Sequence, residues 1–296
     1  MAASAAVARA EVALPVEYCQ VRPGRMLAVH RRVHPRATHT LFFVHGSCGS
    51  LLQWQAQLDH SSRFSSVLAY DSYGCGRSPK PYEWEAYASH ALIADLVALV
   101  QRFSASSSSE KLVLVAHSAA AGFALQAVRW LSEAPGEGRR QIAGVVTVSA
   151  LDAVPSALAL FRLPLCVLTR LQPSLSAGFV EGALHEETRA ARTEEHQELL
   201  SLCDGINEAN PMYMCQAYYR QLLTPSDEEI AAVRVPVMLI AGEADKIVPP
   251  AASLRWAAIL GSERAQLHVL PFGSHQVMQE QPAEVNRLLD RFLDTV

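Results

Sequence analysis

The most regular feature of the chain is the alternation of short apolar runs with longer segments whose apolar residues recur at helical spacing. Strands that alternate with helical segments are typical of a mostly parallel sheet whose crossover helices cover both faces. We therefore predict an α/β fold with one doubly wound sheet. The predicted buried strands are 40–45, 66–71, 111–117, 142–149, 236–241 and 266–270.

A hairpin is predicted ahead of these strands. Segments 17–22 and 26–33 flank Pro23 and Gly24, which are residues that favour turns. Helices are predicted at 51–58, 85–103, 119–131, 251–260 and 283–293.

The predicted helix 85–103 has the clearest two-sided pattern. Its leucines at 92, 96 and 99 recur at the spacing of one helical face, which is expected to pack on the sheet. The opposite face, with Asp95 and Arg102, is expected to be solvated.

The strand rhythm is interrupted between residues 151 and 227, where prolines separate helical stretches. We predict that 151–227 form a helical cap inserted into an α/β core made of 16–150 and 228–296. Residues 1–15 are expected to be a poorly structured N-terminus, and the serine run 106–109 a surface loop.

Composition excludes several classes of protein. The chain has 296 residues, of which 50% are hydrophobic and 18% charged, so it can bury a large core and is not a disordered protein. Lys and Arg number 25 against 29 Asp and Glu, a net charge of −4. The positive field that gathers nucleic acid is absent, so we expect no nucleic-acid partner.

The cysteines and the N-terminus favour a cytoplasmic protein. The six cysteines form no CxxC pair and no dense framework, which indicates reduced thiols. The first fourteen residues lack the basic and continuous apolar regions of a secretory signal, with a mitochondrial presequence around Arg9 as the alternative.

No segment is predicted to span a membrane. The uncharged stretch 112–128 contains His117 and Ser118 and changes period midway, so it is predicted to be strand, turn and helix. The uncharged stretch 171–180 has no basic face beside it, so we expect at most transient contact with a membrane or lipid surface. The pattern favours no particular oligomeric state.

A candidate nucleophile stands where a buried strand meets a helix. Ser118 lies in the run KLVLVAHSAAAG (111–122), the strand–turn–helix context of a nucleophile elbow. The positions two residues away must be small, and both are alanine (Ala116 and Ala120) where glycine is usual. Taken alone, Ser118 is equally consistent with an ordinary helix N-cap.

Two further residues follow strand ends later in the chain. Asp245 comes after the predicted strand 236–241, and His275 after 266–270. Serine, then aspartate, then histidine is the chain order of a known catalytic triad, and open α/β sheets bind ligands at the carboxyl ends of their strands. We predict a triad of Ser118, Asp245 and His275, with Asp152 as an alternative acid.

A glycine-containing loop follows the first parallel strand. It begins His45, Gly46, Ser47, and the N–H groups of Ser47 and Ala119 are predicted to form an oxyanion hole. The alternative is a plain glycine turn. No G-x-G-x-x-G or G-K-[ST] follows this strand, so nucleotide binding is unsupported.

Together these segments resemble the α/β-hydrolase superfamily over about residues 16–293. The resemblance rests on His45-Gly46, the loop 71–78, the serine elbow, Gly242-Glu243-Ala244-Asp245 and Gly273-Ser274-His275. It implies that these are, in turn, the oxyanion loop, a structural glycine turn, the nucleophile, the acid and the base. A narrower resemblance, carried by 163–168, 235–249 and 273–278, is to the group of α/β-hydrolase domain-containing protein 8.

The expected function is hydrolysis of carboxylic esters or thioesters through an acyl-enzyme, which requires no metal and no organic cofactor. The partner is a small-molecule ester or lipid. An apolar acyl group is favoured by the cap side chains, although such clusters are also typical of simple packing. These side chains are Phe161, Leu163, Leu165, Val167, Leu168, Phe179, Met212, Tyr213, Met214 and Tyr218.

The alternatives come from departures from the family pattern. Epoxide hydrolases and haloalkane dehalogenases use an aspartate nucleophile, whereas this chain has Ser118. The lipid acyltransferase signature of a related branch places Asp five positions after the histidine, where this chain has Glu280. The two elbow alanines keep open a catalytically weak or inactive protein that uses the fold for binding or scaffolding.

Overall fold

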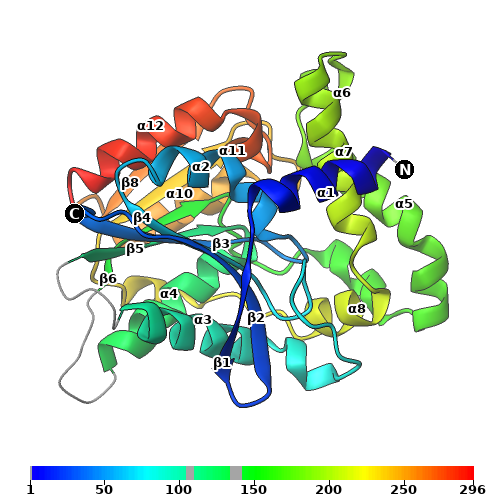
Figure 1. The fold of residues 1–296 in the computed structure, drawn as a ribbon, viewed down its shortest axis with the longest axis horizontal. Helices are drawn as coiled ribbons and strands as arrows, with labels where there is room; N and C mark the ends of the chain where they lie inside the picture. The colour runs from blue at the N-terminus through cyan, green and yellow to red at the C-terminus, as the bar shows by residue number, and fades with distance from the viewer. Residues whose placement is uncertain (1, 105–109, 134–141) are drawn as a thin grey trace.

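The computed structural model describes residues 2–104, 110–133 and 142–296, and one sheet forms its centre. Its strands are β1 (Glu17–Arg22), β2 (Arg25–Arg32), β3 (His39–Val44), β4 (Ser66–Asp71), β5 (Lys111–His117), β6 (Ile142–Val148), β7 (Val237–Gly242) and β8 (Ala265–Leu270). They lie in the order β1-β2-β4-β3-β5-β6-β7-β8 (Figure 1). Strands β3 to β8 are parallel, and β1 and β2 are antiparallel.

The predicted α/β fold is confirmed, and each predicted strand ends within one residue of the observed one. The serine run 106–109, predicted to be a loop, lies outside the described residues. Gly24 in the predicted hairpin turn has φ 71°, a left-handed conformation that glycine adopts without a steric penalty.

The central strands are buried on both faces, which explains their continuous apolar runs. Alternate residues of β3 enter different clusters: Phe42 and Val44 pack on one side of the sheet, Leu41 and Phe43 on the other. The first cluster includes side chains of α3 (Ser89–Ser104), α4 (Ala119–Glu133) and α10 (Pro250–Leu260). The second includes side chains of α2 (Gln55–Ser61) and α12 (Pro282–Leu293).

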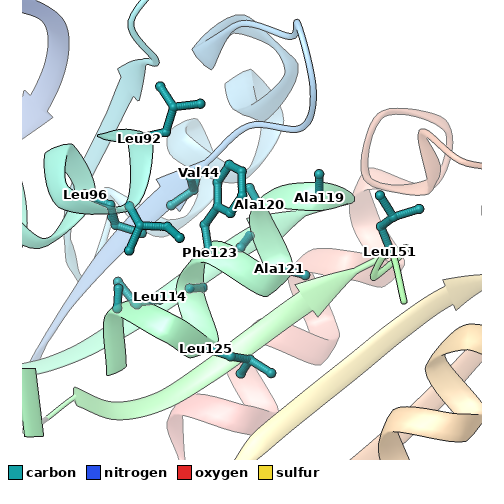
Figure 2. Close-up of a cluster of buried hydrophobic side chains, with 14 of the residues drawn as sticks. Val44, Leu92, Leu96, Leu114, Ala119, Ala120, Ala121, Phe123, Leu125 and Leu151 are labelled. Carbon is teal, nitrogen blue, oxygen red and sulfur yellow. The ribbon is translucent and has the colours of Figure 1, made fainter. Parts of the chain in front are cut away.

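Figure 2 shows part of the first cluster, where the start of α4 meets the sheet. Ala119, Ala120 and Ala121 are buried there in the same cluster as Val44 and Leu114. Small side chains at this helix start let α4 approach the strand ends closely.

The N-terminus differs from the expectation of a poorly structured segment. Residues Ala2–Ala13 form helix α1, which packs against α7 (Glu194–Glu208). Leu14 is fully buried, and Arg77 Nη2 donates to its carbonyl at 2.9 Å. The prediction of disorder was wrong because an alanine-rich segment has high helix propensity even without a strong two-sided pattern.

The expectation that Asp95 is solvated was also wrong. Its carboxylate accepts hydrogen bonds from Arg22 Nη2 at 2.7 Å and from Arg25 Nε at 3.0 Å, and the residue is 1% exposed. The hairpin β1–β2 covers this face of α3, and Arg25 also stacks on the Tyr73 ring at 3.7 Å from its centroid. The helical pattern does not reveal this cover, because the hairpin comes from a distant part of the chain.

The chain between β6 and β7 is helical. It contains η3 (Ser156–Arg162), α5 (Leu165–Ala183), α6 (Glu186–Ala190), α7, α8 (Met212–Arg220) and α9 (Asp227–Ala231), which we call the helical insertion (residues 156–231). Pro164 and Pro211 stand directly before α5 and α8, where a fixed φ favours helix initiation. Figure 1 shows α5, α7 and α8 gathered at one side of the molecule together with α1.

Three short helices complete the described chain: η1 (Leu51–Trp54), η2 (Trp84–Tyr87) and α11 (Val277–Glu280). Within the described ranges, no helix combines the length and apolar character that crossing a membrane demands.

Candidate active site

Ser118 occupies the turn between β5 and α4 in a strained conformation. Its φ is 55°, in the left-handed region that non-glycine residues rarely adopt. The turn is held by hydrogen bonds from Ser118 N to Val148 O at 2.8 Å and from Leu151 N to Ser118 O at 3.3 Å. Ala116 and Ala120 are buried on either side, so alanine at these positions is compatible with the geometry of an elbow.

His275 and Asp245 come together above the ends of β8 and β7. His275 Nδ1 lies 2.9 Å from Asp245 Oδ2, and both side chains are almost fully buried. The other carboxylate oxygen accepts the backbone N–H groups of Ile247 and Val248 at 2.9 and 2.8 Å. The carboxylate is therefore fixed in place, and because a carboxylate only accepts hydrogen bonds, Nδ1 of His275 carries a proton.

Asp152, the alternative acid, has a different partner. Its carboxylate lies 3.8 Å from Arg255 Nη1 and is partly exposed. Of the two candidates, Asp245 is the one in contact with His275.

The backbone of His275 is anchored to the strand ends beside it. His117 Nε2 donates to the His275 carbonyl at 2.9 Å, and Ser149 Oγ donates to the same oxygen at 3.3 Å. Gln53 Nε2 donates to His117 Nδ1 at 3.0 Å. These bonds require His117 to be neutral, and burial, the largest cause, holds its pKa well below its usual range.

The loop after β3 lies against the elbow. A Cβ atom on Gly46 would stand 2.6 Å from His117 Nδ1 and 3.1 Å from Ser118 Cβ, so only glycine fits there. His45 donates from Nδ1 to the Gly46 carbonyl at 2.8 Å and accepts the Ser72 N–H on Nε2 at 2.9 Å. This histidine shapes the loop, and burial lowers its pKa.

The predicted oxyanion donors have different surroundings. Ser47 lines the cavity beside Ser118. Ala119 is the first residue of α4, and the first N–H groups of a helix have no acceptor within it. The next loop residue, Cys48, has φ 51°, and Asn210 Nδ2 of the helical insertion donates to its carbonyl at 2.5 Å.

Ser118 and His275 line the same cavity, which has a volume of about 120 Å³. Its other walls come from the β3 loop, from the helical insertion and from residues just past the ends of β6 and β7. The insertion contributes Leu158, Ile206, Tyr219 and Leu222, and the two strand ends contribute Leu151 and Ile247. Within the described chain, no hydrogen bond joins the Ser118 hydroxyl to the His275 ring. The Ser118 hydroxyl therefore lines a cavity that His275 also lines, without a hydrogen bond that fixes it; catalytic hydrogen bonds are often long or poorly aligned before substrate binds.

Of the cap side chains that the sequence favoured for an acyl pocket, Phe179 lines this cavity, with its ring edge-on to His275 at 6.4 Å. Leu168 and Met214 are fully buried in the core, and Leu163 and Val167 are exposed. Most of that apolar cluster serves packing.

The loop that carries His275 is bonded to the helical insertion. Glu280 accepts the Ser274 N–H on one oxygen at 3.0 Å and the His185 N–H on the other at 2.6 Å. Gln276 N donates to the Ala183 carbonyl at 3.0 Å. The position of the insertion and that of the His275 loop are thus coupled through the end of α5 and the start of α6.

The sequence indicates the candidate residues just past strand ends, but it does not indicate the residues that hold them in position through hydrogen bonds. Gln53, Ser149, Asn210 and the bridging role of Glu280 carry no local signal, because each acts through a partner far away in the chain. His117 directly precedes Ser118, the candidate nucleophile, and its position in the elbow was the one signal available.

Comparison with known proteins agrees with this geometry. A model of the Alpha/beta hydrolase family matches residues 41–288. Protein ABHD8 of Bos taurus and Protein ABHD8 of Homo sapiens are each 31% identical to the chain over 261 residues, or 87% of this chain and 56% of the relative. The chain thus spans just over half the length of these curated relatives, and the narrower resemblance seen in the sequence is confirmed.

Solved structures share the fold. A hydrolase from Pseudomonas aeruginosa PA01 has a TM-score of 0.77 at 19% identity and covers 94% of this chain and 98% of that one. The esterase EaEST from Exiguobacterium antarcticum has a TM-score of 0.76 at 13% identity, with the same coverages. A thermophilic esterase from Thermogutta terrifontis has a TM-score of 0.73 at 19% identity and covers 91% and 94%.

The parallel sheet, the left-handed serine after β5 and the Asp–His pair after β7 and β8 agree with a family match over most of the residues. The chain belongs to the alpha/beta hydrolase family.

Proposed function

We propose that the protein is a serine hydrolase of carboxylic esters or thioesters, with Ser118 as nucleophile, His275 as general base and Asp245 as the acid that orients it. The observation that carries the proposal is the strained Ser118 on the wall of a cavity that it shares with an Asp-bound histidine. Backbone strain at a polar side chain beside a cavity is characteristic of functional sites.

The mechanism follows from the hydrogen bond between His275 and Asp245. Because Nδ1 donates a hydrogen bond to Asp245 and keeps its proton, Nε2 is the nitrogen that takes the proton of the Ser118 hydroxyl as it attacks the carbonyl carbon. The N–H groups of Ser47 and Ala119 would stabilise the oxyanion. His275 then protonates the leaving alcohol or thiol, and a water molecule releases the acid in a second step.

The cavity favours a small or apolar group next to the reacting carbonyl. Leucine, isoleucine and aromatic side chains form much of its wall. A volume of about 120 Å³ is close to that of an apolar cavity of about 150 Å³ that holds benzene. A short acyl group fits this space, whereas the medium-chain or lipid-like acyl group favoured by the sequence must extend beyond it.

The test is hydrolysis of 4-nitrophenyl acetate by the wild type and by Ser118→Ala. Removal of the nucleophile is expected to lower kcat by at least about 10³-fold. Ser253→Ala, a buried serine on α10, is the matched control and should retain wild-type activity. A Ser118→Ala enzyme as fast as the parent would rule out the mechanism.

A second candidate is a protein that uses the fold for binding without catalysis, and the absence of a Ser118–His275 hydrogen bond in the described chain is the observation in its favour. A fluorophosphonate probe separates the two. Labelling that disappears in Ser118→Ala supports the enzyme, and a folded wild type that takes no label supports the binding protein.

Lipid acyl transfer is less well supported. Both oxygens of Glu280 accept backbone N–H groups, and the residue does not line the cavity. The Glu280 carboxylate therefore holds the backbone at Ser274 and His185 and does not face the cavity in which acyl transfer would take place.

A further inference from the structure

A second and larger hollow lies beside the catalytic cavity. It is a groove of about 520 Å³ between α1, the η1–α2 segment and α7. Figure 1 shows α1 lying alongside α7. The N-terminal helix α1 therefore supplies one wall of this groove.

The groove and the catalytic cavity share two side chains. Gln53 and Gln279 line both. Gln53 is buried and holds His117, which in turn anchors the His275 backbone. The groove therefore adjoins the catalytic cavity at these two glutamines.

The walls of the groove suit an alkyl chain. The apolar side chains that line it are Ala6, Ala10, Leu52, Ala56, Leu199 and Leu202. The alanines, on α1 and α2, are small and leave space in the groove, and Leu199 and Leu202 of α7 form a further apolar wall. The volume exceeds that of the catalytic cavity, 520 against 120 Å³, so a chain too long for the cavity finds space here.

The charged lining of the groove is acidic. Asp59, Glu195 and Glu198 line it against a single cation, Arg9. Arg9 pairs with Glu198 at 2.9 Å, and Asp59 pairs with Arg32 at 3.1 Å. Among the residues that the structure describes, Glu195 has no ion-pair partner, so the groove retains an uncompensated negative charge.

We propose that this groove is a second substrate subsite, which binds the distal part of an extended acyl chain ending in an ammonium group. The inference rests on the proposed hydrolase function and adds the substrate class. The reacting carbonyl lies at Ser118, the chain passes Gln53 and Gln279, and the cationic end meets Glu195.

The chain-length part is tested with 4-nitrophenyl acetate and 4-nitrophenyl octanoate. The readout is the octanoate-to-acetate ratio of kcat/KM. Ala10→Trp and Ala56→Trp fill the groove from two different elements and are expected to lower this ratio about tenfold, the loss of contact with roughly two methylenes. Ala5→Trp, on the exposed face of the same helix α1, is the matched control and should leave the ratio at the wild-type value.

The charge part is tested with 4-nitrophenyl 8-aminooctanoate and the mono-4-nitrophenyl ester of suberic acid, which have chains of equal length and opposite terminal charge. The wild type is expected to prefer the ammonium ester about two- to fivefold at low salt, as for an exposed ion pair. Glu195→Lys should reverse the preference. Glu194→Lys, with the same change in net charge on a neighbouring residue that does not line the groove, should preserve it.

The outcomes distinguish this inference from the function on which it rests. Hydrolysis of all four esters with equal ratios in Ala10→Trp, Ala56→Trp and Ala5→Trp, or a preference for the suberate ester, would overturn the subsite alone. Hydrolysis of none of the esters by the folded wild type would overturn the proposed function and the subsite together.

Discussion

At the scale of single residues, the candidate triad is held by contacts that differ in kind. Ser118 is held by hydrogen bonds of its backbone, Asp245 by two backbone N–H groups, and His275 by Asp245 and by donors to its own carbonyl. Each contact fixes an orientation that a substitution can remove separately.

Asp245→Asn should show this most clearly. The amide cannot favour the same imidazole tautomer or stabilise the imidazolium, so kcat for ester hydrolysis is expected to fall about 10³- to 10⁴-fold. Asp152→Asn, which changes a carboxylate paired with Arg255, should stay within about twofold of wild type. Equal losses in the two variants, measured with 4-nitrophenyl acetate, would contradict the assignment of the acid.

Gly46→Ala tests the packing of the oxyanion loop on the elbow. The new methyl would stand 2.6 Å from His117 Nδ1, so His117 or the loop must shift. We expect a loss of about 1–3 kcal/mol in the free energy of unfolding and about 10²-fold in kcat/KM. Gly178→Ala in α5 is the control, because nothing lies within 4 Å of its new methyl group, and it should lower neither the free energy of unfolding nor kcat/KM. Wild-type behaviour of Gly46→Ala would show that the loop tolerates the contact.

The sequence predicted the candidate triad because each member stands just past a strand end, and parallel strands bring such positions to one edge. It could not predict which residues anchor them. Ser149 and Glu280 act through hydrogen bonds to residues 126 and 6 positions away, and neither spacing has a recognisable local pattern.

At the scale of elements, two contacts between distant segments bear on stability and activity. The first joins the hairpin β1–β2 to α3 through Asp95, and the second joins the helical insertion to the His275 loop through Glu280. Each links parts of the chain that the sequence pattern treats separately.

Asp95→Ala is expected to destabilise the fold without direct effect on the site. It leaves Arg25, 9% exposed, without its carboxylate, and breaking such a buried pair costs about 3–5 kcal/mol. Asp59→Ala, which removes an exposed pair with Arg32, should cost less than about 1 kcal/mol. Urea unfolding of the two variants provides the comparison, and equal midpoints would show that the Asp95 cluster contributes little.

Glu280→Ala is expected to lower kcat about tenfold or more, because the Ser274 and His185 N–H groups lose their acceptor and the base loop is no longer tied to the insertion. Glu280→Gln keeps one acceptor oxygen and should recover part of the loss. A positioning role predicts an effect mainly on kcat with an altered pH profile. Glu284→Ala, at a partly exposed position of α12, is the control, and unchanged kinetics in Glu280→Ala would exclude the coupling.

At the scale of the whole molecule, several neutral histidines are built into the core. Burial, the largest cause in each case, lowers the pKa of His30, His45 and His117 below the ordinary value of 6.5. In the unfolded chain these residues bind protons below about pH 6.5, whereas in the folded protein they do so only at lower pH. Protonation of these histidines in the unfolded chain therefore lowers the free energy of unfolding. This free energy is unaffected by them above about pH 6.5 and decreases as the pH falls from there through the folded pKa values.

The free energy of unfolding should accordingly decrease between pH 7 and pH 5, with a contribution of up to about 1.4 kcal/mol per pH unit from each neutral histidine. His30→Gln removes one contribution and should flatten the profile. His90→Gln, at an exposed position, should leave the slope unchanged. Urea titrations over this range would contradict the account if wild-type stability rose on acidification.

The doubly wound sheet was predictable because buried parallel strands and amphipathic helices are periodic in the sequence. The N-terminal helix was not, since its alanines show little amphipathic pattern and its burial depends on α7, nearly two hundred residues later in the numbering. That long-range packing is also what creates the groove beside the catalytic cavity.

The most direct test of the central claim is peptide mapping by mass spectrometry after reaction with a fluorophosphonate. The account predicts one adduct on the peptide that contains Ser118, lost in His275→Ala, which removes the base. An adduct instead on Ser47 or on a cavity cysteine such as Cys48 or Cys203, or no adduct on the folded protein, would contradict the assignment of Ser118 as the nucleophile.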